Sequence, residues 1–385
     1  MQVRRLSGLD GLRELRAPWV SLHSRSGLYS RHEWHLACAT HLLRDAGSLT
    51  YLQFIEDERT VAIVPIIASI ESVRCFGRVH AISVGLHDHL SLADIPMASD
   101  ASVEDIADAL AEELVHWNER WDVLLWPRIL AGSNLMRLAE NLKKFSVNVI
   151  PAAPCNTLDT SQPFKELSAG FSKNLRSSLR KSEQRLADSG GATLATNGIV
   201  TGQDGAADST ATAQMSDTER AYEQFLVLEG SGWKGEAGTA SAIGLNPALR
   251  GFYAELLAQR GKDFAAEVTC LLRGDAPIAA QFSVHTSDWR HVLKIGYNES
   301  ESKFSPGQVL MARVLEHASN IKVTRVSLVT DMPWHHTWRP LAEPTCNVMI
   351  FRRRWRALVY RACVGGLRKT KLALLAMLFL LELSD

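Results

Sequence analysis

The sequence predicts an α/β (α+β) protein with two tandem domains, each a mixed, mainly antiparallel sheet flanked by helices. Three observations support this fold class. The chain has 385 residues, of which 46% are hydrophobic and 22% charged, so it is long enough for two cores. The first half alternates strand-like and helix-like stretches. The second half has three strand-like stretches in succession, followed by a helix and one more strand.

In the first half, the apolar residues follow clear periods. A hairpin is expected from Leu49–Ile55 and Val61–Ile70, with a turn at Glu56–Arg59 between them. Later elements are expected in the order helix, buried strand, helix, strand, at Val103–Arg120, Val123–Trp126, Asn134–Phe145 and Val147–Leu158.

A single basic helix is expected over Phe164–Asp188. Its charged side chains are either a solvated face or a site for a phosphate or an acidic substrate; they are Lys173, Arg176, Arg180, Lys181 and Arg185. The residues that follow are rich in Gly, Ala, Thr and Asp and predict a surface insertion. The predicted organisation is an N-terminal half (1–163), a connecting helix (164–189), an insertion (190–217), a C-terminal half (218–345) and a tail (346–385).

The second half contains strands at Phe264–Leu272, Pro277–His285 and His291–Tyr297. A four-residue loop between the last two would place Gln281 directly across from Lys294. The same register sets Thr269 beside Gln281 and Glu267 beside Ser283. One face of this sheet is therefore polar in its middle, either as a solvated surface or as the floor of a cleft; the cleft is favoured because such sheets are usually covered on both sides.

The stretch Phe225–Ala240 ends a helix that begins near Ser216 and combines several groups suited to handling a substrate. Glu229 continues the buried stripe of that helix, so it is either a desolvated proton acceptor or a solvated helix end. Glycines such as Gly235 stop the helix and allow a close backbone approach. Trp233 offers an apolar wall and Lys234 a positive charge.

A second helix start, at Ser305-Pro306-Gly307-Gln308, is suited to an anionic group such as a pyrophosphate. Capping of the helix alone would also explain it. The buried side of this helix is expected to comprise Leu310, Val314, Ala318 and Ile321. A strand at Val323–Val329 and an aromatic, histidine-rich loop at Asp331–Trp338, with Trp334, follow.

The charge and cysteine patterns exclude several classes of protein. Forty-two basic residues balance forty-two acidic ones, so no net field attracts nucleic acid. The six cysteines are far apart, which argues against zinc and disulfides and favours a reducing cytoplasm. The His87-Asp88-His89 and His335-His336 pairs lack a third ligand at a defined spacing, so no metal is predicted. No apolar signal peptide begins the chain.

Near its C-terminus the chain carries a basic stretch followed by the ten apolar residues Leu372–Leu381. Ten residues are too few to cross a bilayer, which needs about 20. The segment 352–381 therefore either packs as a last helix on the protein or makes peripheral contact with a membrane interface.

Four pieces of the second half resemble one family. They are L-E-G-S-G-W-K-G-E-A-G-T-A (228–240), G-D-A-P-I-A-A (274–280), K-I-G-Y-N-E (294–299) and F-S-P-G-Q-V-L (304–310). Together with the order of the elements, they resemble the GNAT acyltransferases associated with cellulose and exopolysaccharide biosynthesis, which are related to the Fem ligases. The resemblance implies two tandem GNAT-like domains. The sequence differs from the family at Asn298, where an aspartate is usual, and at the loop after residue 327, where Asp331 stands without the usual Tyr-Lys pair.

The resemblance implies acyl-CoA as co-substrate and assigns roles to residues of the second half. With the residue patterns above, it gives Glu229 and Lys294 as catalytic residues. The expected substrate-binding residues are Trp233, Lys234, Gly235, Gln281, Tyr297, Asp331 and Trp334, and the expected cofactor-binding residues are Ser305, Gly307 and Gln308.

The predicted function is transfer of an acyl group to an amine or hydroxyl of an envelope, polysaccharide or related small-molecule acceptor by a cytoplasmic enzyme. Two alternatives stay open. One is a Fem-like transferase that uses aminoacyl-tRNA and contacts it through the basic helix. The other is a non-catalytic exopolysaccharide assembly factor held at the inner membrane by its tail.

Overall fold

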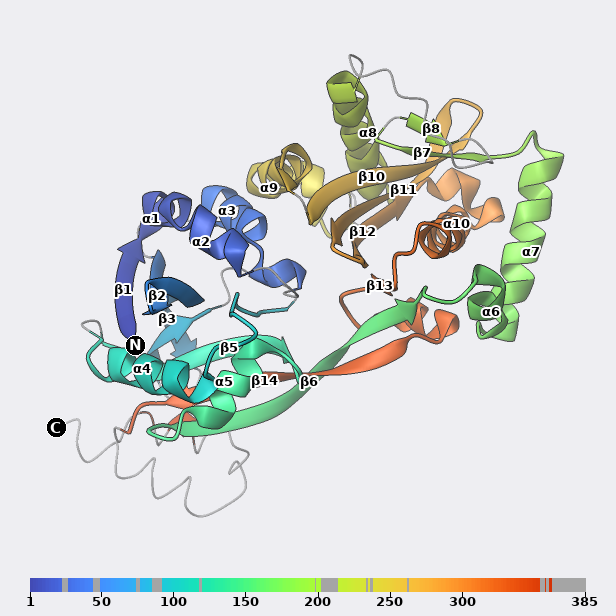
Figure 1. Ribbon diagram of the computed structural model, residues 1–385. Helices are drawn as coiled ribbons and strands as arrows, with labels where there is room; N and C mark the ends of the chain where they lie inside the picture. The colour runs from blue at the N-terminus through green and yellow to red at the C-terminus, as the bar shows by residue number, and fades with distance from the viewer. Residues whose placement is uncertain are drawn as a thin grey trace. The chain divides into compact units, whose positions relative to one another are not determined.

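The computed structural model describes residues 1–361 except 23–26, 44–48, 74–76, 85–91, 118–119, 198, 202–213, 233–234, 236–237, 262, 354–356 and 358–359. The chain forms two compact units (Figure 1). The first comprises residues 1–39, 43–153 and 344–385, and the second comprises residues 40–42 and 154–343.

The first unit is built on a sheet with the strand order β1-β2-β3-β4-β5-β14. All neighbouring strands are antiparallel except β4 and β5, which are parallel and are joined through α4. The strands are β1 (Gln2–Ser7), β2 (Leu49–Glu56), β3 (Arg59–Val73), β4 (Gly77–Ser83), β5 (Val123–Leu130) and β14 (Leu341–Phe351). The helices are α1 (Gly8–Glu14), α2 (Arg16–Ser21), η1 (Leu28–Ser30), α3 (His32–His41), α4 (Val103–Val115) and α5 (Asn134–Asn141).

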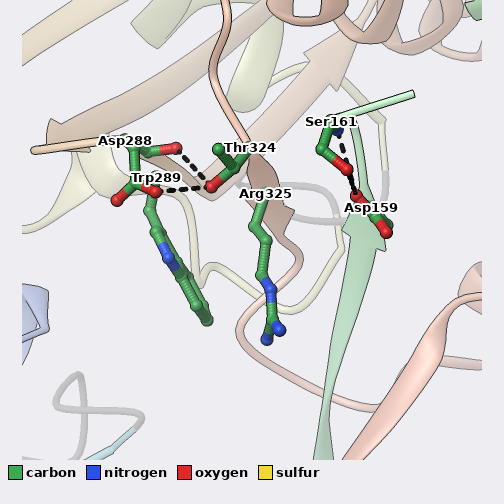
Figure 2. A pocket seen from close by; sticks show the side chains of 6 residues that line it. All are labelled: Asp159, Ser161, Asp288, Trp289, Thr324 and Arg325. Carbon is green, nitrogen blue, oxygen red and sulfur yellow. Dashed lines mark hydrogen bonds between the residues drawn. The ribbon is translucent and has the colours of Figure 1, made fainter. Parts of the chain in front are cut away.

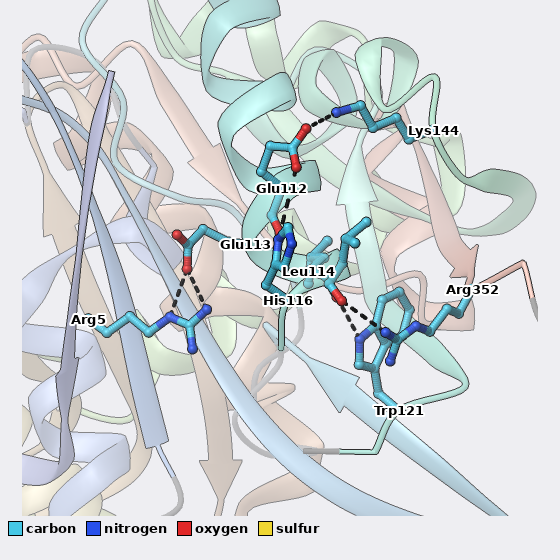
Figure 3. A network of polar contacts seen from close by, with 9 residues as sticks. Arg5, Glu112, Glu113, Leu114, His116, Trp121, Lys144 and Arg352 are labelled. Atoms are coloured by element: carbon cyan, nitrogen blue, oxygen red, sulfur yellow. Dashed lines mark hydrogen bonds and ion pairs between the residues drawn. The ribbon is translucent and has the colours of Figure 1, made fainter. Parts of the chain in front are cut away.

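Helix α4 is fixed at several points along its length. Arg5 of β1 pairs with Glu113 at 2.6 Å, and Trp121 Nε1 donates to Leu114 O at 3.0 Å (Figure 3). The guanidinium of Arg352, which follows β14, lies 5.5 Å from the centre of the Trp121 ring. These contacts hold the crossover between the two parallel strands against the sheet.

The second unit has the strand order β6-β13-β12-β11-β10-β7-β8. The strands are β6 (Ser146–Asp159), β7 (Thr193–Thr196), β8 (Ile199–Thr201), β9 (Arg260–Gly261), β10 (Phe264–Arg273), β11 (Ala276–Thr286), β12 (Trp289–Tyr297) and β13 (Arg325–Ser327). The helices are α6 (Phe164–Ala169), α7 (Lys173–Asp188), α8 (Gln214–Glu229), η4 (Ile243–Leu245), α9 (Pro247–Ala258), η5 (Glu299–Phe304), α10 (Pro306–Asn320) and η6 (Pro333–Trp338). Helices α8 and α9 pack on β10–β12, and α10 packs against the same strands (Figure 1).

The same order of elements occurs in both units. In the first, β2, β3 and β4 form an antiparallel meander, and α4 leads to β5, which pairs with β4 in parallel. In the second, β10, β11 and β12 form the meander, and α10 leads to β13, which pairs with β12 in parallel. This repetition is the predicted tandem architecture, and the α/β fold class is confirmed.

Each unit completes its sheet with a strand that is distant in the sequence. Strand β6 follows the first repeat along the chain but pairs with β13 of the second unit, between Thr157–Asp159 and Arg325–Ser327. Strand β14 follows the second repeat but pairs with β5 of the first unit. Strand β14 therefore brings residues 344–351 back to the first unit, whereas the second unit is the continuous segment 154–343 with residues 40–42 added.

Most predicted elements are confirmed, with shifts at their ends. The hairpin in the first half and the three strands of the second half are present. The expected single helix Phe164–Asp188 is wrong: Gly170 ends α6, and Ser172 starts α7 by accepting a hydrogen bond from Leu175 N at 3.2 Å. Ile321 is also not buried, since α10 ends at Asn320 and leaves it 51% exposed.

Within the described residues, no helix has both the length and the apolar character needed to cross a membrane. The apolar run 372–381 and most of the basic stretch before it lie outside those residues. Ala357 and Tyr360 lie at the described end of the chain and pack with Val123 and Phe351 of the first unit.

Candidate active site

Strands β12 and β13 part from each other in the middle of the second unit. They pair in parallel only from Trp289–Arg325 to His291–Ser327. Strand β12 continues to Tyr297, and beyond His291 no other described strand lies along that edge. Backbone groups on such an edge can bind an extended ligand in the way that an added strand would.

The end of β13 is shaped by an unusual backbone conformation. Val329 has φ +64°, which is rare for a β-branched residue because its Cβ crowds the backbone there. Its N–H donates to Ser327 Oγ at 3.1 Å, which fixes the turn. The chain therefore leaves the sheet two residues after β13, while β12 runs on. Such strained positions often occur at functional sites.

The start of α10 follows the open end of β12 through η5. Ser305 is the N-cap residue and Pro306 the first helical residue, as predicted, but the Ser305 side chain makes no capping hydrogen bond and its φ is +45°. A Cβ at Gly307 would lie 3.6 Å from Tyr297 Cδ1, an ordinary contact. Gln308 Oε1 accepts a hydrogen bond from Ser178 Oγ of α7 at 3.0 Å. The three expected cofactor-binding residues thus lie together beside β12.

Glu229 lies at the C-terminal end of α8 and is 2% exposed. Its Oε2 accepts a hydrogen bond from Ile243 N of η4 at 2.9 Å. A Cβ at Gly296 of β12 would lie 2.6 Å from the backbone N and Cα of Glu229. The missing side chain at Gly296 therefore lets β12 approach the end of α8, and Glu229 is buried as its position on the apolar stripe predicts.

This close approach leads to a prediction for Gly296. We expect Gly296→Ala to lower the free energy of unfolding of the second unit by roughly 3 kcal/mol, because the new methyl group meets backbone atoms that cannot rotate away. Gly244→Ala is the matched control, since the nearest atom to its Cβ would be Leu226 Cβ at 3.9 Å. Urea denaturation of both variants measures the difference, and equal stability of the two would contradict the tight contact.

The glycine-rich turn after α8 contacts the end of β12. Ser231 Oγ donates to Tyr297 O at 2.9 Å, and Gly232 has φ +80°, a conformation that favours glycine. Gly235 N donates to Gly232 O at 3.1 Å and closes the turn. Tyr297 is 42% exposed at this point. Two further predicted residues, Trp233 and Lys234, lie outside the described residues.

The predicted pairing of Gln281 with Lys294 is wrong. Lys294 pairs with Phe282, and the next pair is Ser283 with Val292, so a bulge in β12 shifts the register by one residue. Lys294 therefore shares a face with Phe282, whose ring lies 5.8 Å from that of Phe225 in α8. Gln281 is fully buried on the opposite face, where its Nε2 donates to Ser283 Oγ at 2.8 Å. The two side chains do not meet.

The polar face of the sheet carries a buried ion pair that the sequence alone does not indicate. The predicted registers of Thr269 with Gln281 and of Glu267 with Ser283 are confirmed. Arg290, 2% exposed, pairs through Nη2 with Glu267 Oε1 at 2.6 Å and donates to Thr269 Oγ1 at 2.9 Å. His285 Nε2 lies 3.2 Å from the same carboxylate oxygen. Helix α10 packs on this sheet, so the polar face is an interior network rather than a solvated surface.

Stability should depend on pH through Glu267. Burial acts to raise its pKa, but the charge of Arg290 and the contact with His285 outweigh burial and lower the pKa to about 2. An unfolded glutamate titrates near 4.3, so the unfolded chain binds more protons between those values. The stabilisation is thus complete above about pH 4.3, and roughly 3 kcal/mol is lost as the pH falls toward 2. Urea denaturation of the wild type and of Glu267→Gln from pH 2 to 6 tests this. The free energy of unfolding of the variant should lack the part of the fall with decreasing pH that Glu267 causes.

The loop after β13 places Asp331 beside β6. Asp331 Oδ1 accepts a hydrogen bond from Asn156 Nδ2 at 2.9 Å and lies 3.1 Å from His336 Nε2. Trp334 is 39% exposed and meets the buried His335 edge-on, with ring centres 4.2 Å apart. Asn156 was not among the predicted residues, since it lies in a strand about 170 positions away whose partner is set only by the tertiary fold.

No group of three or more potential metal ligands occurs among the residues that the structure describes. His87, Asp88 and His89 lie outside them.

The fold and the parted strands define an α/β domain with an open strand edge beside a helix start. Residues 173–336 match the family model of the acetyltransferase (GNAT) domain. No protein of curated function shows significant sequence similarity to this chain.

Solved structures resemble nearly the whole chain. FemX aligns with a TM-score of 0.55 and 11% identity over 90% of this chain and 97% of its own. The C-terminal domain of a putative lysylphosphatidylglycerol synthetase from Agrobacterium fabrum aligns with a TM-score of 0.51 and 13% identity, over 93% and 99%. A tandem GNAT protein from the clavulanic acid biosynthesis pathway aligns with a TM-score of 0.44 and 11% identity, over 91% and 98%. At these identities the first two likenesses show a shared fold.

Proposed function

We propose that the second unit transfers an acyl group from a coenzyme A thioester to an amine or hydroxyl of an envelope, polysaccharide or related small-molecule acceptor. The observation that carries the proposal is the parting of β12 and β13 after His291, inside a domain that matches the GNAT family. An extended donor with amide groups can lie along the open edge of β12 and hydrogen-bond to it. The choice of acceptor is supported by the motif resemblance at residues 228–240 and 294–310.

The start of α10 is suited to the phosphate end of such a donor. The backbone N–H groups of a helix start and its dipole favour an anion. The two acidic residues of η5 would oppose this, but Glu301 is neutralised by Arg273 at 2.5 Å. Ser305, Gly307 and Gln308 would bind there, and Gly307 leaves room for a close approach.

The proposed reaction uses residues on the α8 face of β12. The acceptor attacks the thioester carbonyl, and Glu229 takes its proton directly or through a water molecule. Lys294, which shares that face, or a backbone amide of β12 stabilises the oxyanion. Tyr297, Trp334, Asp331 and the turn with Trp233, Lys234 and Gly235 would contact the acceptor.

Binding of acetyl-CoA tests the donor. At about 100 times the dissociation constant a ligand stabilises the folded protein by about 2.7 kcal/mol, so we expect the melting temperature to rise by roughly 5 °C. Gly307→Glu should abolish this rise without unfolding the protein, because a carboxylate is tolerated at a helix start but repels the phosphates. Absence of any shift with the wild type, together with no binding by calorimetry, would exclude acyl-CoA as the donor.

Helix α7 favours a second candidate donor, aminoacyl-tRNA. Lys173, Arg176, Arg180 and Lys181 are all exposed along this helix. Such a row of cations can contact a phosphate backbone, and binding of this kind weakens steeply with salt. Tight binding of tRNA that falls steeply between 50 and about 200 mM salt, without any response to acetyl-CoA, would favour this donor.

A further inference from the structure

A cavity of about 450 Å³ lies at the end of the sheet where β12 and β13 begin (Figure 2). Six residues of the second unit line it: Asp159, Ser161, Asp288, Trp289, Thr324 and Arg325. Three of them stand in one row, because Arg325 of β13 pairs with Trp289 of β12 on one side and with Asp159 of β6 on the other. Directly paired residues point to the same face of a sheet, so these three side chains form one continuous surface.

The Arg325 guanidinium is fixed in place and still has N–H groups to donate. Its central carbon lies 5.0 Å from the centre of the Trp289 ring, and Nη1 donates to Glu343 Oε1 at 2.7 Å. Nε and Nη2 make no hydrogen bond to any residue that the structure describes. The edge of a guanidinium formed by Nε and one Nη matches the two oxygens of a carboxylate. The Arg325 side chain is 43% exposed, so a ligand can reach this edge.

A carboxylate lies on either side of Arg325 (Figure 2). Asp159 Oδ1 accepts hydrogen bonds from Ser161 N at 3.0 Å and from Ser161 Oγ at 2.5 Å, and Asp288 Oδ2 accepts one from Thr324 Oγ1 at 2.7 Å. Among the described residues, the second oxygen of each carboxylate makes no hydrogen bond. The hydrogen bonds from Ser161, with a smaller effect of the charge of Arg325, lower the pKa of Asp159, so it is an anion at neutral pH.

The charges around the cavity favour a ligand that carries charges of both signs. Glu343 offsets the charge of Arg325, and Asp159 and Asp288 then leave the cavity negative. A ligand with a carboxylate alone would be repelled, and one with ammonium groups alone would leave the free edge of Arg325 without an acceptor. A diamino acid has one carboxylate and two ammonium groups, which is one group for each of the three charged residues. Two strand spacings, roughly 10 Å, separate the two aspartates, so a ligand must be extended to contact both.

We propose that this cavity is a binding site for a diamino acid such as lysine, separate from the acyl-transfer site. The ligand carboxylate binds to Nε and Nη2 of Arg325, its α-ammonium group to Asp159, and its side-chain ammonium group to Asp288. The Trp289 side chain supplies apolar surface for the methylene groups between them. The site is separate because the paired part of β12 and β13 lies between the cavity and the open edge of β12, which begins after His291.

Calorimetric titration of the full chain with three small molecules tests this site. We expect L-lysine to bind at least about tenfold more tightly than L-norleucine, which lacks the side-chain ammonium group, because a hydrogen bond between charged groups contributes that much. Cadaverine, which lacks the carboxylate, should be weaker than L-lysine by a similar factor. Asp288→Asn should weaken L-lysine about tenfold and leave L-norleucine unchanged, whereas Arg325→Gln should weaken L-lysine and leave cadaverine unchanged.

The matched control is Asp275→Asn, which removes the same charge from an exposed turn at the opposite end of β11. It should bind L-lysine like the wild type, and thermal unfolding shows that each variant is folded. If L-lysine does not bind to the wild type, or binds alike to Asp288→Asn and Asp275→Asn, the site is refuted. The rise in melting temperature expected with acetyl-CoA should persist in Asp288→Asn, so this proposal and that of acyl transfer can fail independently.

Discussion

Replacing Arg290 by methionine is expected to lower the free energy of unfolding of the second unit by about 3–5 kcal/mol, as measured by urea denaturation at pH 7. The substitution leaves Glu267 as a partly buried carboxylate without its main counter-charge, since the Arg290 Nη2 atom lies only 2.6 Å from it. Arg290 also donates to the hydroxyls of Thr269 and Ser283, and each hydroxyl would lose that hydrogen bond. A buried charge left uncompensated in this way costs far more than the lost packing of the arginine chain.

The double variant Glu267→Gln/Arg290→Met separates charge from packing. Without either charge there is no unpaired ion, so most of the lost stability should return. An exposed pair of the same type, Arg59 with Asp100 at 2.9 Å, gives the matched control: Arg59→Met should leave the free energy of unfolding nearly unchanged. If Arg290→Met were as mild as Arg59→Met, the network would be a solvated surface feature and not part of the core.

The elements that could be predicted from the sequence are those whose apolar residues recur at a single helical or strand spacing. The meander β10–β11–β12 is of this kind, and so is the burial of Glu229, which depends only on its place three residues after Leu226. The predicted registers of Thr269 and Glu267 are correct, although the pairing shifts by one residue between Leu271 and Leu272, on the turn side of both. Local patterns thus identify the elements around the site.

The errors arise where one residue changes the geometry of those after it. The bulge in β12 is invisible in the alternation of the sequence, yet it moves Lys294 to the face of α8 and away from Gln281. Gly170 and Ser172 divide one expected helix in two. Contacts between residues that are distant in the sequence could not be predicted either. Asn156 contacts Asp331 because β6 pairs with β13, and this pairing is set only by the tertiary fold.

Glu229 stabilises the structure by accepting a hydrogen bond from Ile243 N. Two substitutions can separate this structural role from the proposed catalytic role. Glu229→Gln retains an oxygen that can accept the hydrogen bond from Ile243 N, now 2.9 Å from Oε2, but it cannot take up a proton. We expect it to unfold at nearly the temperature of the wild type while kcat/KM for acyl transfer falls about 10²–10⁴-fold, the usual contribution of a general base.

Glu229→Ala should lose activity as well and also become less stable, by about 1–3 kcal/mol, because the buried N–H of Ile243 is left without an acceptor. Release of the CoA thiol from acetyl-CoA, measured alongside thermal unfolding for both variants, distinguishes the two roles. Full transfer activity in Glu229→Gln would show that the carboxylate serves only to accept the hydrogen bond from Ile243 N. Another residue along β12 would then have to be the general base. A parallel loss of activity and stability in both variants would likewise assign Glu229 to the structure alone.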